Sequence, residues 1–250
     1  MKRLLKQLLR QVARIHHAYN EEKNSLSAKK LRYRNLSDEL KARAINTSAD
    51  FVEQHLEEAL VFHGKMEIRD FAIEKISQSR DISRNICLEF GVFTGGSINY
   101  FSKNLPAFQF HGFDSFEGLN EDWFGNYRSR GYFDLKGKPP LVNENVSLHQ
   151  GWYTHTLTPF LDSNDISNKI AFIHMDSDTY DSTKFVLETL LPYLNKHETL
   201  ILFDDFLSYP NWINGEHKAL YDCKDKFGFQ IKYLGFSDQQ ALVSIEKIDN

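Results

Sequence analysis

The sequence predicts an α/β fold, in which a mostly parallel seven-stranded sheet ends in one antiparallel strand and is preceded by N-terminal helices. Two observations support this prediction. From residue 85 onward, short apolar runs alternate with segments of helical periodicity, as in parallel strands joined by helices. The last two runs, 229–234 and 241–246, are joined by a short segment that begins at Gly235 and predict a β-hairpin. One strand of this pair therefore runs against the rest of the sheet.

The individual elements follow from the same patterns. Buried parallel strands show continuous apolar runs, which here predict strands at 85–90, 109–113, 145–149, 170–175 and 199–203, before the hairpin. Helical spacing predicts helices at 96–104, 154–161, 181–194 and 214–226. Upstream, Ser48 or Asp50 can cap a helix that carries Phe51, Val52, Leu56 and Leu60, and another helix is expected at 66–77. We expect residues 48–80 to form a helical cap over the mouth of a ligand cleft.

The charge distribution separates residues 1–47, a predicted basic helical extension, from a domain at 48–250. Residues 1–34 contain 10 Lys and Arg against 2 Glu, a balance of +8, so the other residues, with 20 basic and 32 acidic side chains, carry −12. Leucines and other apolar residues at helical spacing from Leu4 to Ile15 predict an amphipathic helix. This helix is expected to pack on the body or on a second subunit, which would make a homodimer; a solvated helix is the alternative.

Composition excludes several classes of protein. The apolar runs are shorter than the ~20 residues of a membrane span. The segment Met1–Gln11 lacks the continuous apolar core of a secretory signal. Cys87 and Cys223 form neither a disulfide framework nor a metal-binding spacing. We therefore expect a cytoplasmic protein, and one that does not bind nucleic acid, because its acidic body lacks a basic, aromatic-lined groove.

The segment that follows the first predicted strand has the character of a cofactor loop. It contains an acidic residue, glycines and the start of a helix, and its candidate cofactor-binding residues are Glu89, Gly91, Thr94 and Ser97. It matches neither the dinucleotide Gly-x-Gly-x-x-Gly pattern nor a P-loop. The carboxylate before the first glycine suits a ligand with an ammonium group, such as S-adenosylmethionine (SAM). An ordinary tight turn without a ligand is the alternative.

Ligands of parallel α/β sheets bind where the strands end, so the residues after the next two strands are also candidates. Asp114, followed by Ser115, comes after the second strand and can accept hydrogen bonds from both ribose hydroxyls of an adenosine cofactor. Gln150 and Trp152 follow the third strand and suit the edge and the face of an adenine ring.

Pairs of aspartates follow the fourth and fifth predicted strands: Asp176 and Asp178, then Asp204 and Asp205. Four carboxylates at one edge of a sheet repel one another unless a cation or a proton lies among them. Hard oxygen ligands of this kind suit Mg²⁺. A helix-capping role for individual aspartates is the alternative. His174, close to this group, is expected to be an ordinary core histidine.

The interval 115–144 is too long for a simple connection and is expected to be an active-site lid. It interleaves aromatic residues such as Trp123 and Phe133 with basic residues such as Arg128. The aromatic side chains suit a wall for an acceptor molecule, and the basic ones suggest a phosphorylated or nucleotide-linked sugar. A variable surface excursion is the alternative.

Five motifs, in the same order along residues 50–247, resemble the macrocin O-methyltransferase family. These motifs are Glu89–Ser97, Gly112–Leu119, Gly151–Leu157, Met175–Thr183 and Phe203–Phe206. The resemblance implies a Rossmann-like class I methyltransferase fold and a SAM- and Mg²⁺-dependent enzyme that methylates a hydroxyl of a sugar or a glycosylated small molecule. Residues 1–34 and the 120–144 lid depart from the family pattern, which leaves the substrate open.

Residue by residue, the resemblance assigns Asp176, Asp204 and Asp205 to the metal and Asp178 to the general base. It assigns Glu89, Gly91, Ser97 and Asp114 to SAM; Asp176 is counted with these cofactor residues as well.

Two other functions remain open on the sequence. Asp176-Ser-Asp178 is also an Asp-x-Asp motif, which a metal-dependent glycosyltransferase can use to hold a nucleotide sugar. A non-catalytic scaffold with a methyltransferase-like body is the second alternative, although the candidate base and metal ligands are intact.

Overall fold

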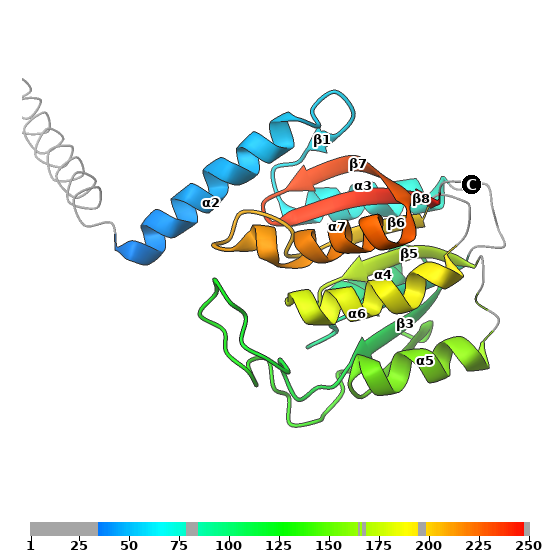
Figure 1. The fold of residues 1–250 in the computed structure, drawn as a ribbon. Helices are drawn as coiled ribbons and strands as arrows, with labels where there is room; N and C mark the ends of the chain where they lie inside the picture. Colours follow the sequence, from blue (N-terminus) through cyan, green and yellow to red (C-terminus); the bar gives the residue numbers. More distant parts are fainter. Residues whose placement is uncertain (1–34, 79–84, 165, 167–168, 195–198, 248–250) are drawn as a thin grey trace, which may run out of the picture. The chain divides into compact units, whose positions relative to one another are not determined.

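The computed structural model describes residues 35–78, 85–164, 166, 169–194 and 199–247 (Figure 1). The chain divides between Arg43 and Ala44 into two units. Helix α2, Leu36–Glu53, begins in the first and ends in the second, and the remaining elements described below belong to the second. The predicted amphipathic helix near the N-terminus lies outside the described residues.

The second unit contains one eight-stranded sheet with the order β1-β7-β8-β6-β5-β2-β3-β4. Strand β8 pairs antiparallel with both of its neighbours, and all other pairs are parallel. The predicted mostly parallel sheet with one reversed strand is therefore confirmed, but it has eight strands instead of the predicted seven, because β1 adds an edge strand beside β7. The strands are β1 (Leu60–Val61), β2 (Ile86–Phe90), β3 (Gln109–Asp114), β4 (Val146–Gln150), β5 (Ile170–Met175), β6 (Thr199–Phe203), β7 (Phe229–Ser237) and β8 (Gln240–Lys247).

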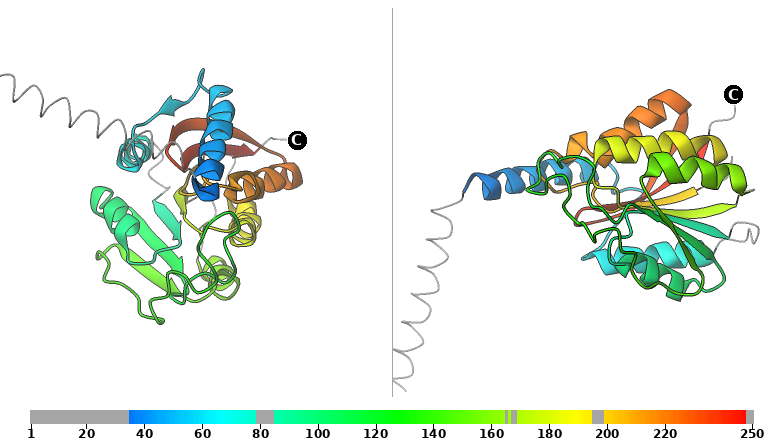
Figure 2. Two further views of the ribbon diagram at one scale, coloured as in Figure 1. Left: turned by 90° about the vertical axis from the view of Figure 1, so that its left-hand side faces the viewer. Right: turned by 90° about the horizontal axis from the view of Figure 1, so that it is seen from below.

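Helices cover both faces of this sheet, as Figure 2 shows. One face packs against α5 (Tyr153–Ser163), α6 (Tyr180–Leu190) and α7 (Glu216–Phe227). The other packs against α3 (Lys65–Ser77) and α4 (Gly96–Asn104). Short 3₁₀ turns, Leu191–Tyr193 and Trp212–Asn214, follow α6 and precede α7.

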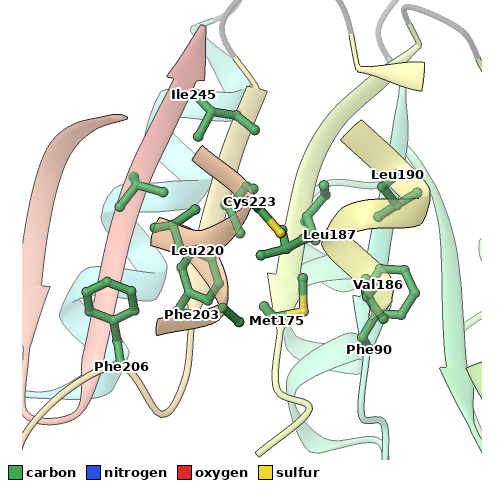
Figure 3. Close-up of a cluster of buried hydrophobic side chains, with 14 of the residues drawn as sticks. Phe90, Met175, Val186, Leu187, Leu190, Phe203, Phe206, Leu220, Cys223 and Ile245 are labelled. Carbon is green, nitrogen blue, oxygen red and sulfur yellow. The ribbon is translucent and has the colours of Figure 1, made fainter. Parts of the chain in front are cut away.

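The inner strands are continuous apolar runs in sequence because both of their faces pack into an apolar core. In Figure 3, side chains from β2, β5, β6 and β8 meet those of α6 and α7. Phe90, Met175 and Phe203 of the sheet and Leu187 of α6 are completely buried in this cluster. Burial of side chains of this size contributes about 1.5–3 kcal/mol each. The carboxyl ends of the strands, where the aspartates follow, are therefore held in place by this packed core.

Helix α2 differs from the prediction. It begins well before Ser48, and the Asn35 side chain accepts a hydrogen bond from the Asp38 N–H at its start. Ser48 is buried and its hydroxyl accepts a hydrogen bond from the Ser208 N–H. Leu56 and Leu60 are 52% and 53% exposed. The predicted helix from Ser48 through Leu60 is therefore wrong, because turns follow Glu53 and Leu60 lies in β1, an edge strand paired with β7.

The predicted helix at 181–194 is also shorter than expected. Helix α6 ends at Leu190 and continues as a 3₁₀ turn containing Pro192, which has no N–H to donate to a helix. None of the helices in the described ranges is both long and apolar enough to cross a bilayer.

The interval 115–144 contains no helix and no strand beyond an isolated bridge between Glu117 and Asp134. It is nevertheless held in place. Trp123 is 5% exposed and its ring lies 5.6 Å from that of Tyr209. The Asn211 side chain also donates a hydrogen bond to the Phe124 carbonyl. The interval is thus fastened to the segment that follows β6.

Candidate active site

A cavity of about 700 Å³ lies where β2, β3, β4, β5 and β6 end. Eight predicted site residues line it: Gly91, Asp114, Ser115, Trp152, Asp176, Asp178, Asp204 and Asp205. The structure thus gathers residues from five separate strand ends around one space. Four predicted cofactor residues, Glu89, Thr94, Ser97 and Gln150, do not line it.

Gly91 brings two of these strand ends into direct contact. Its φ of +92° is a conformation that side chains disfavour, and a Cβ there would lie 1.8 Å from the Asp176 carbonyl oxygen. Gly95 also has a positive φ, +80°, and precedes the first turn of α4. The glycines therefore allow the loop after β2 to pass closely over the loop after β5.

Asp114 holds the glycine loop in shape. One carboxylate oxygen accepts hydrogen bonds from the N–H groups of Val92 and Phe93, at 2.8 and 2.7 Å, and the other accepts one from the Phe116 N–H at 2.7 Å. The same carboxylate lines the cavity, so it can still meet a ligand hydroxyl through its remaining lone pairs.

The four predicted residues outside the cavity wall have other surroundings. Glu89 is buried and accepts a hydrogen bond from the Ser97 hydroxyl at 2.9 Å. Thr94 is exposed, and the exposed Gln150 side chain donates to the Gly137 carbonyl at 2.9 Å. Glu89, Ser97 and Gln150 therefore support the loops around the cavity, and Thr94 faces solvent.

Beneath the cavity, four charged side chains form an alternating chain. The neighbouring strands β2, β5 and β6 direct Glu89, His174 and Asp204 toward the face covered by α3 and α4. His174 Nδ1 lies 3.0 Å from Glu89 Oε2, and its Nε2 lies 3.5 Å from Asp204 Oδ1. Arg69 of α3 donates to the same Asp204 oxygen at 2.9 Å, and Gln240 donates to it as well. We call these residues the paired side of the site.

The pairing explains the charge states on this side. Burial alone would lower the pKa of His174, but the charge of Glu89 and the contacts with Asp204 raise it to about 10. Burial would raise the pKa of Asp204, but His174 and Arg69 hold it below its ordinary value. Both groups are therefore charged at neutral pH. His174 is thus part of an ion-pair chain, which the prediction of an ordinary core histidine did not include.

Asp176, Asp178 and Asp205 form the unpaired side. They each place a carboxylate oxygen within 4.8 Å of the others. Burial and the negative charges of neighbouring aspartates raise the pKa of each of the three well above its ordinary value. Asp178 also has a positive φ of 62°, a strained backbone conformation that aspartate tolerates better than most residues.

The donor set on the unpaired side fits a divalent cation, since carboxylate oxygens are the ligands that Mg²⁺ prefers. The structure gathers Asp205 with Asp176 and Asp178, and it gathers Asp204 with Asp176 and His174. The three predicted ligands, Asp176, Asp204 and Asp205, are therefore not within one group of 4.8 Å. Asp176 and Asp205 are common to the predicted set and the unpaired side.

Behind Asp205 lies a second layer of polar groups. Glu216 is completely buried, and its Oε2 accepts a hydrogen bond from the Asp205 N–H at 3.1 Å. Burial and the charge of Asp205 raise the pKa of Glu216 well above its usual value. This carboxyl group fixes the backbone of Asp205 from the side away from the cavity.

Aromatic side chains also line the cavity: Trp123, Phe133, Trp152, Tyr153 and Phe185. The charged side chains of Lys65 and Arg128 reach it as well. The cavity therefore combines aromatic surface with a cluster of carboxylates.

Some of these residues had no signal in the sequence. Arg69 lies 135 positions before its partner Asp204, in a helix predicted only from apolar spacing. Tyr153 follows Trp152 directly, so the predicted third strand end could have identified it.

Comparisons with known proteins agree with this geometry. Residues 88–206, just under half of the chain, match the sequence model of a family described as a methyltransferase domain. This match supports the predicted enzyme class for that part of the chain. No curated protein matches the chain in sequence.

Among solved structures, the O-methyltransferase NovP is similar, with a TM-score of 0.52 and 18% sequence identity, over 70% of this chain and 79% of that chain. An O-methyltransferase from Bacillus cereus, solved in complex with SAH, has a TM-score of 0.48 and 10% identity, over 84% and 91% of the two chains. A precorrin-6y C5,15-methyltransferase from Geobacter metallireducens has a TM-score of 0.45 and 11% identity, over 74% and 89%. The similarity to NovP confirms the predicted fold.

Proposed function

We propose that this chain is a SAM- and Mg²⁺-dependent O-methyltransferase that acts on a hydroxyl group of a sugar or a glycosylated small molecule. One observation carries the proposal: the glycine loop, Asp114 and Trp152 line the same cavity as the unpaired carboxylates. A cofactor site and a cation site therefore share one space. The match of residues 88–206 to a methyltransferase domain supports the same conclusion.

The proposed cofactor site uses the ends of β2, β3 and β4. Gly91 leaves room for close approach, Asp114 accepts hydrogen bonds from ribose hydroxyls, and Trp152 packs on the adenine ring. Glu89 and Ser97 do not line the cavity, and their proposed role is to hold the glycine loop through their mutual hydrogen bond. Bound SAM would supply an electrophilic methyl group.

The proposed cation site uses Asp176, Asp204 and Asp205, as the resemblance implies. Asp204 fits this role because Arg69 and Gln240 occupy only one of its two carboxylate oxygens. Bound Mg²⁺ would polarise the acceptor hydroxyl and so lower its pKa.

Asp178 is the proposed general base. It lines the cavity beside Asp176 and Asp205 and has no ion-pair partner among the described residues. Burial and the neighbouring aspartates raise its pKa, so its carboxylate is a stronger base than that of an exposed aspartate; once a bound cation has offset the negative charges and Asp178 is deprotonated, it can accept the proton that the acceptor hydroxyl loses. The aromatic side chains of the cavity exclude water and offer a flat surface for a sugar ring.

The experiment that tests the proposal is a calorimetric titration of the full chain with S-adenosylhomocysteine (SAH), with and without Mg²⁺. We expect micromolar binding of SAH. Asp114→Asn should weaken it about tenfold, which corresponds to the loss of one good charged hydrogen bond. The control Asp162→Asn changes an exposed aspartate of α5 and should leave the affinity unchanged.

Absence of SAH binding would refute the methyltransferase proposal. Binding of a nucleotide sugar such as UDP-glucose in its place would favour the glycosyltransferase alternative. Retention of full SAH affinity in Asp114→Asn would remove Asp114 from the cofactor site.

A further inference from the structure

Arg128 of the 115–144 interval lies inside a box of aromatic rings. Its guanidinium carbon is 5.2 Å from the ring centre of Trp123, 5.0 Å from that of Tyr127, 5.5 Å from that of Tyr132 and 5.4 Å from that of Phe133. Such contacts hold the guanidinium plane in one orientation. Part of this side chain lines the cavity.

The guanidinium has no anionic partner in the described part of the chain. Its Nη1 donates to the Asn126 side chain at 3.1 Å, and the Tyr132 hydroxyl also interacts with it. Its Nε is buried and has no hydrogen-bond partner. The side chain as a whole is half-buried, but a buried donor without an acceptor is unfavourable, and a bound anion that accepts a hydrogen bond from this Nε relieves that penalty.

Arg69 provides the contrast within the same molecule. Arg69 is buried where Arg128 is half-buried, and its charge is paired with Asp204 at 2.9 Å. Arg128 lines the cavity without such an ion pair in the described ranges, and its charge acts on the carboxylates of Asp178 and Asp205, where it opposes the rise in their pKa.

The position of Arg128 favours the acceptor over the cofactor. Its neighbour Trp123 packs on Tyr209, in the segment that follows β6 and the Asp204–Asp205 pair. The proposed cofactor residues follow β2, β3 and β4, toward the other end of the strand order. A group bound by Arg128 therefore lies on the same side of the cavity as Asp178 and Asp205.

We propose that the acceptor carries a phosphate or carboxylate group that Arg128 binds while the acceptor hydroxyl faces Asp178. This inference rests on the proposed function and adds the charge of the acceptor to it. An oxyanion is the chemistry that both groups share, and it matches the planar donor pattern of a guanidinium.

The test uses the full chain, saturated with SAH and Mg²⁺, and two probes, inorganic phosphate and acetate, in calorimetric titrations. We expect one of the two anions to bind, and the one that binds more tightly identifies the group. Arg128→Met should weaken this binding about tenfold, whereas Arg128→Lys, which keeps the charge, should lose less. The control Arg130→Met removes an exposed arginine of the same interval and should bind like the unchanged protein.

Three outcomes would overturn the inference. The first is that neither anion binds the unchanged protein. The second is that Arg128→Met binds the anion as tightly as Arg130→Met does. The third is that Arg128→Met loses SAH affinity, which would place Arg128 in the cofactor site. Intact SAH binding by Arg128→Met also shows that this variant is folded. If the unchanged protein does not bind SAH, the proposed function itself fails, and the two failures are thus distinguishable.

Discussion

Asp204 and Asp178 line the same cavity but differ in what surrounds them. Asp204 has Arg69, His174 and Gln240 around one oxygen and stays charged, with a pKa below its ordinary value. Asp178 has two other aspartates within 4.8 Å and a pKa well above its ordinary value. On the paired side the charge of Asp204 is already balanced and its second carboxylate oxygen is left for the proposed cation, whereas the unpaired side needs a proton or a cation to offset its charge. The comparison thus separates a carboxylate held charged by the protein from carboxylates whose charge depends on what binds.

The largest effect is expected from breaking the paired side. Arg69→Met leaves the charge of Asp204 beneath the cavity without its main partner, and should lower the free energy of unfolding by about 3 kcal/mol, the usual loss when one member of a buried pair is removed. Denaturant unfolding measures this loss. The double variant Arg69→Met, Asp204→Asn should recover part of it, and Arg130→Met should stay within about 0.5 kcal/mol of the unchanged protein. Equal losses in the single and double variants would mean that Arg69 acts by packing alone.

The cation site gives the next largest effect and sharpens the assignment of its ligands. Asp204→Asn and Asp205→Asn should each weaken Mg²⁺ or Mn²⁺ binding about 100-fold, roughly 2.7 kcal/mol, because each removes a charged ligand. Asp178→Asn should keep the cation affinity and lose methyl transfer. Calorimetric titration of the three variants measures the affinities. Should Asp178→Asn lose the cation while Asp204→Asn keeps it, the third ligand would be Asp178.

Two histidines differ in the same way as the aspartates, because one has a charged partner and the other has none among the described residues. His174 is paired, but burial lowers the pKa of His111 to about 4, and its ring partner is His149 rather than a carboxylate. In acid the unfolded chain takes up a proton at His111 before the folded chain does. The free energy of unfolding should therefore fall as the pH decreases from about 6.5 to 4.

His111→Gln should reduce this pH-dependent loss by about 1–2 kcal/mol, since glutamine does not titrate in this range. Urea unfolding at several pH values measures it. His155→Gln, at an exposed histidine of α5, is the matched control. The explanation is wrong if both variants lose stability in acid as steeply as the unchanged protein.

The smallest effect concerns the unpaired side without a cation. Asp205→Asn removes one of three crowded negative charges and should raise the free energy of unfolding of the metal-free protein by about 1 kcal/mol at neutral pH. Added Mg²⁺ should stabilise the unchanged protein and leave this variant nearly unaffected. Thermal unfolding with a chelator and with Mg²⁺ compares the two. A metal-free variant that is less stable than the unchanged protein would mean that Asp205 has a favourable partner.

The sequence predicted the parts of this molecule that depend on local pattern. Strands β2, β5 and β6 lie inside the sheet and are almost entirely buried, so their apolar runs were visible, and an aspartate after a strand is read directly from the chain. The start of α2 was missed because its amphipathic pattern is weak and Asn35 caps it without a following apolar run. The edge strand β1 was missed because two residues carry no periodicity.

Other features depend on contacts between distant residues. Glu89 was expected at the cofactor, but the register of β2 beside β5 places it opposite His174, and the pair is buried together. Asp205 joins Asp176 and Asp178 across two strand ends, and Asp178 has a positive φ that no neighbouring residue predicts. Such arrangements are set by packing, so the residue types were predictable and their partners were not.

The placement of the tryptophans gives the protein its own optical signal. The chain contains three, and two of them, Trp123 and Trp152, line the cavity on different sides. Trp123 stands over Arg128 on the acceptor side, and Trp152 follows β4 on the cofactor side. The third, Trp212, is buried and does not line the cavity, so with Trp212 also replaced by phenylalanine, replacement of either cavity tryptophan leaves an emission spectrum in which the other reports on its own half of the cavity. The occupancy of each half is thus readable by intrinsic fluorescence, without a label and without a known acceptor.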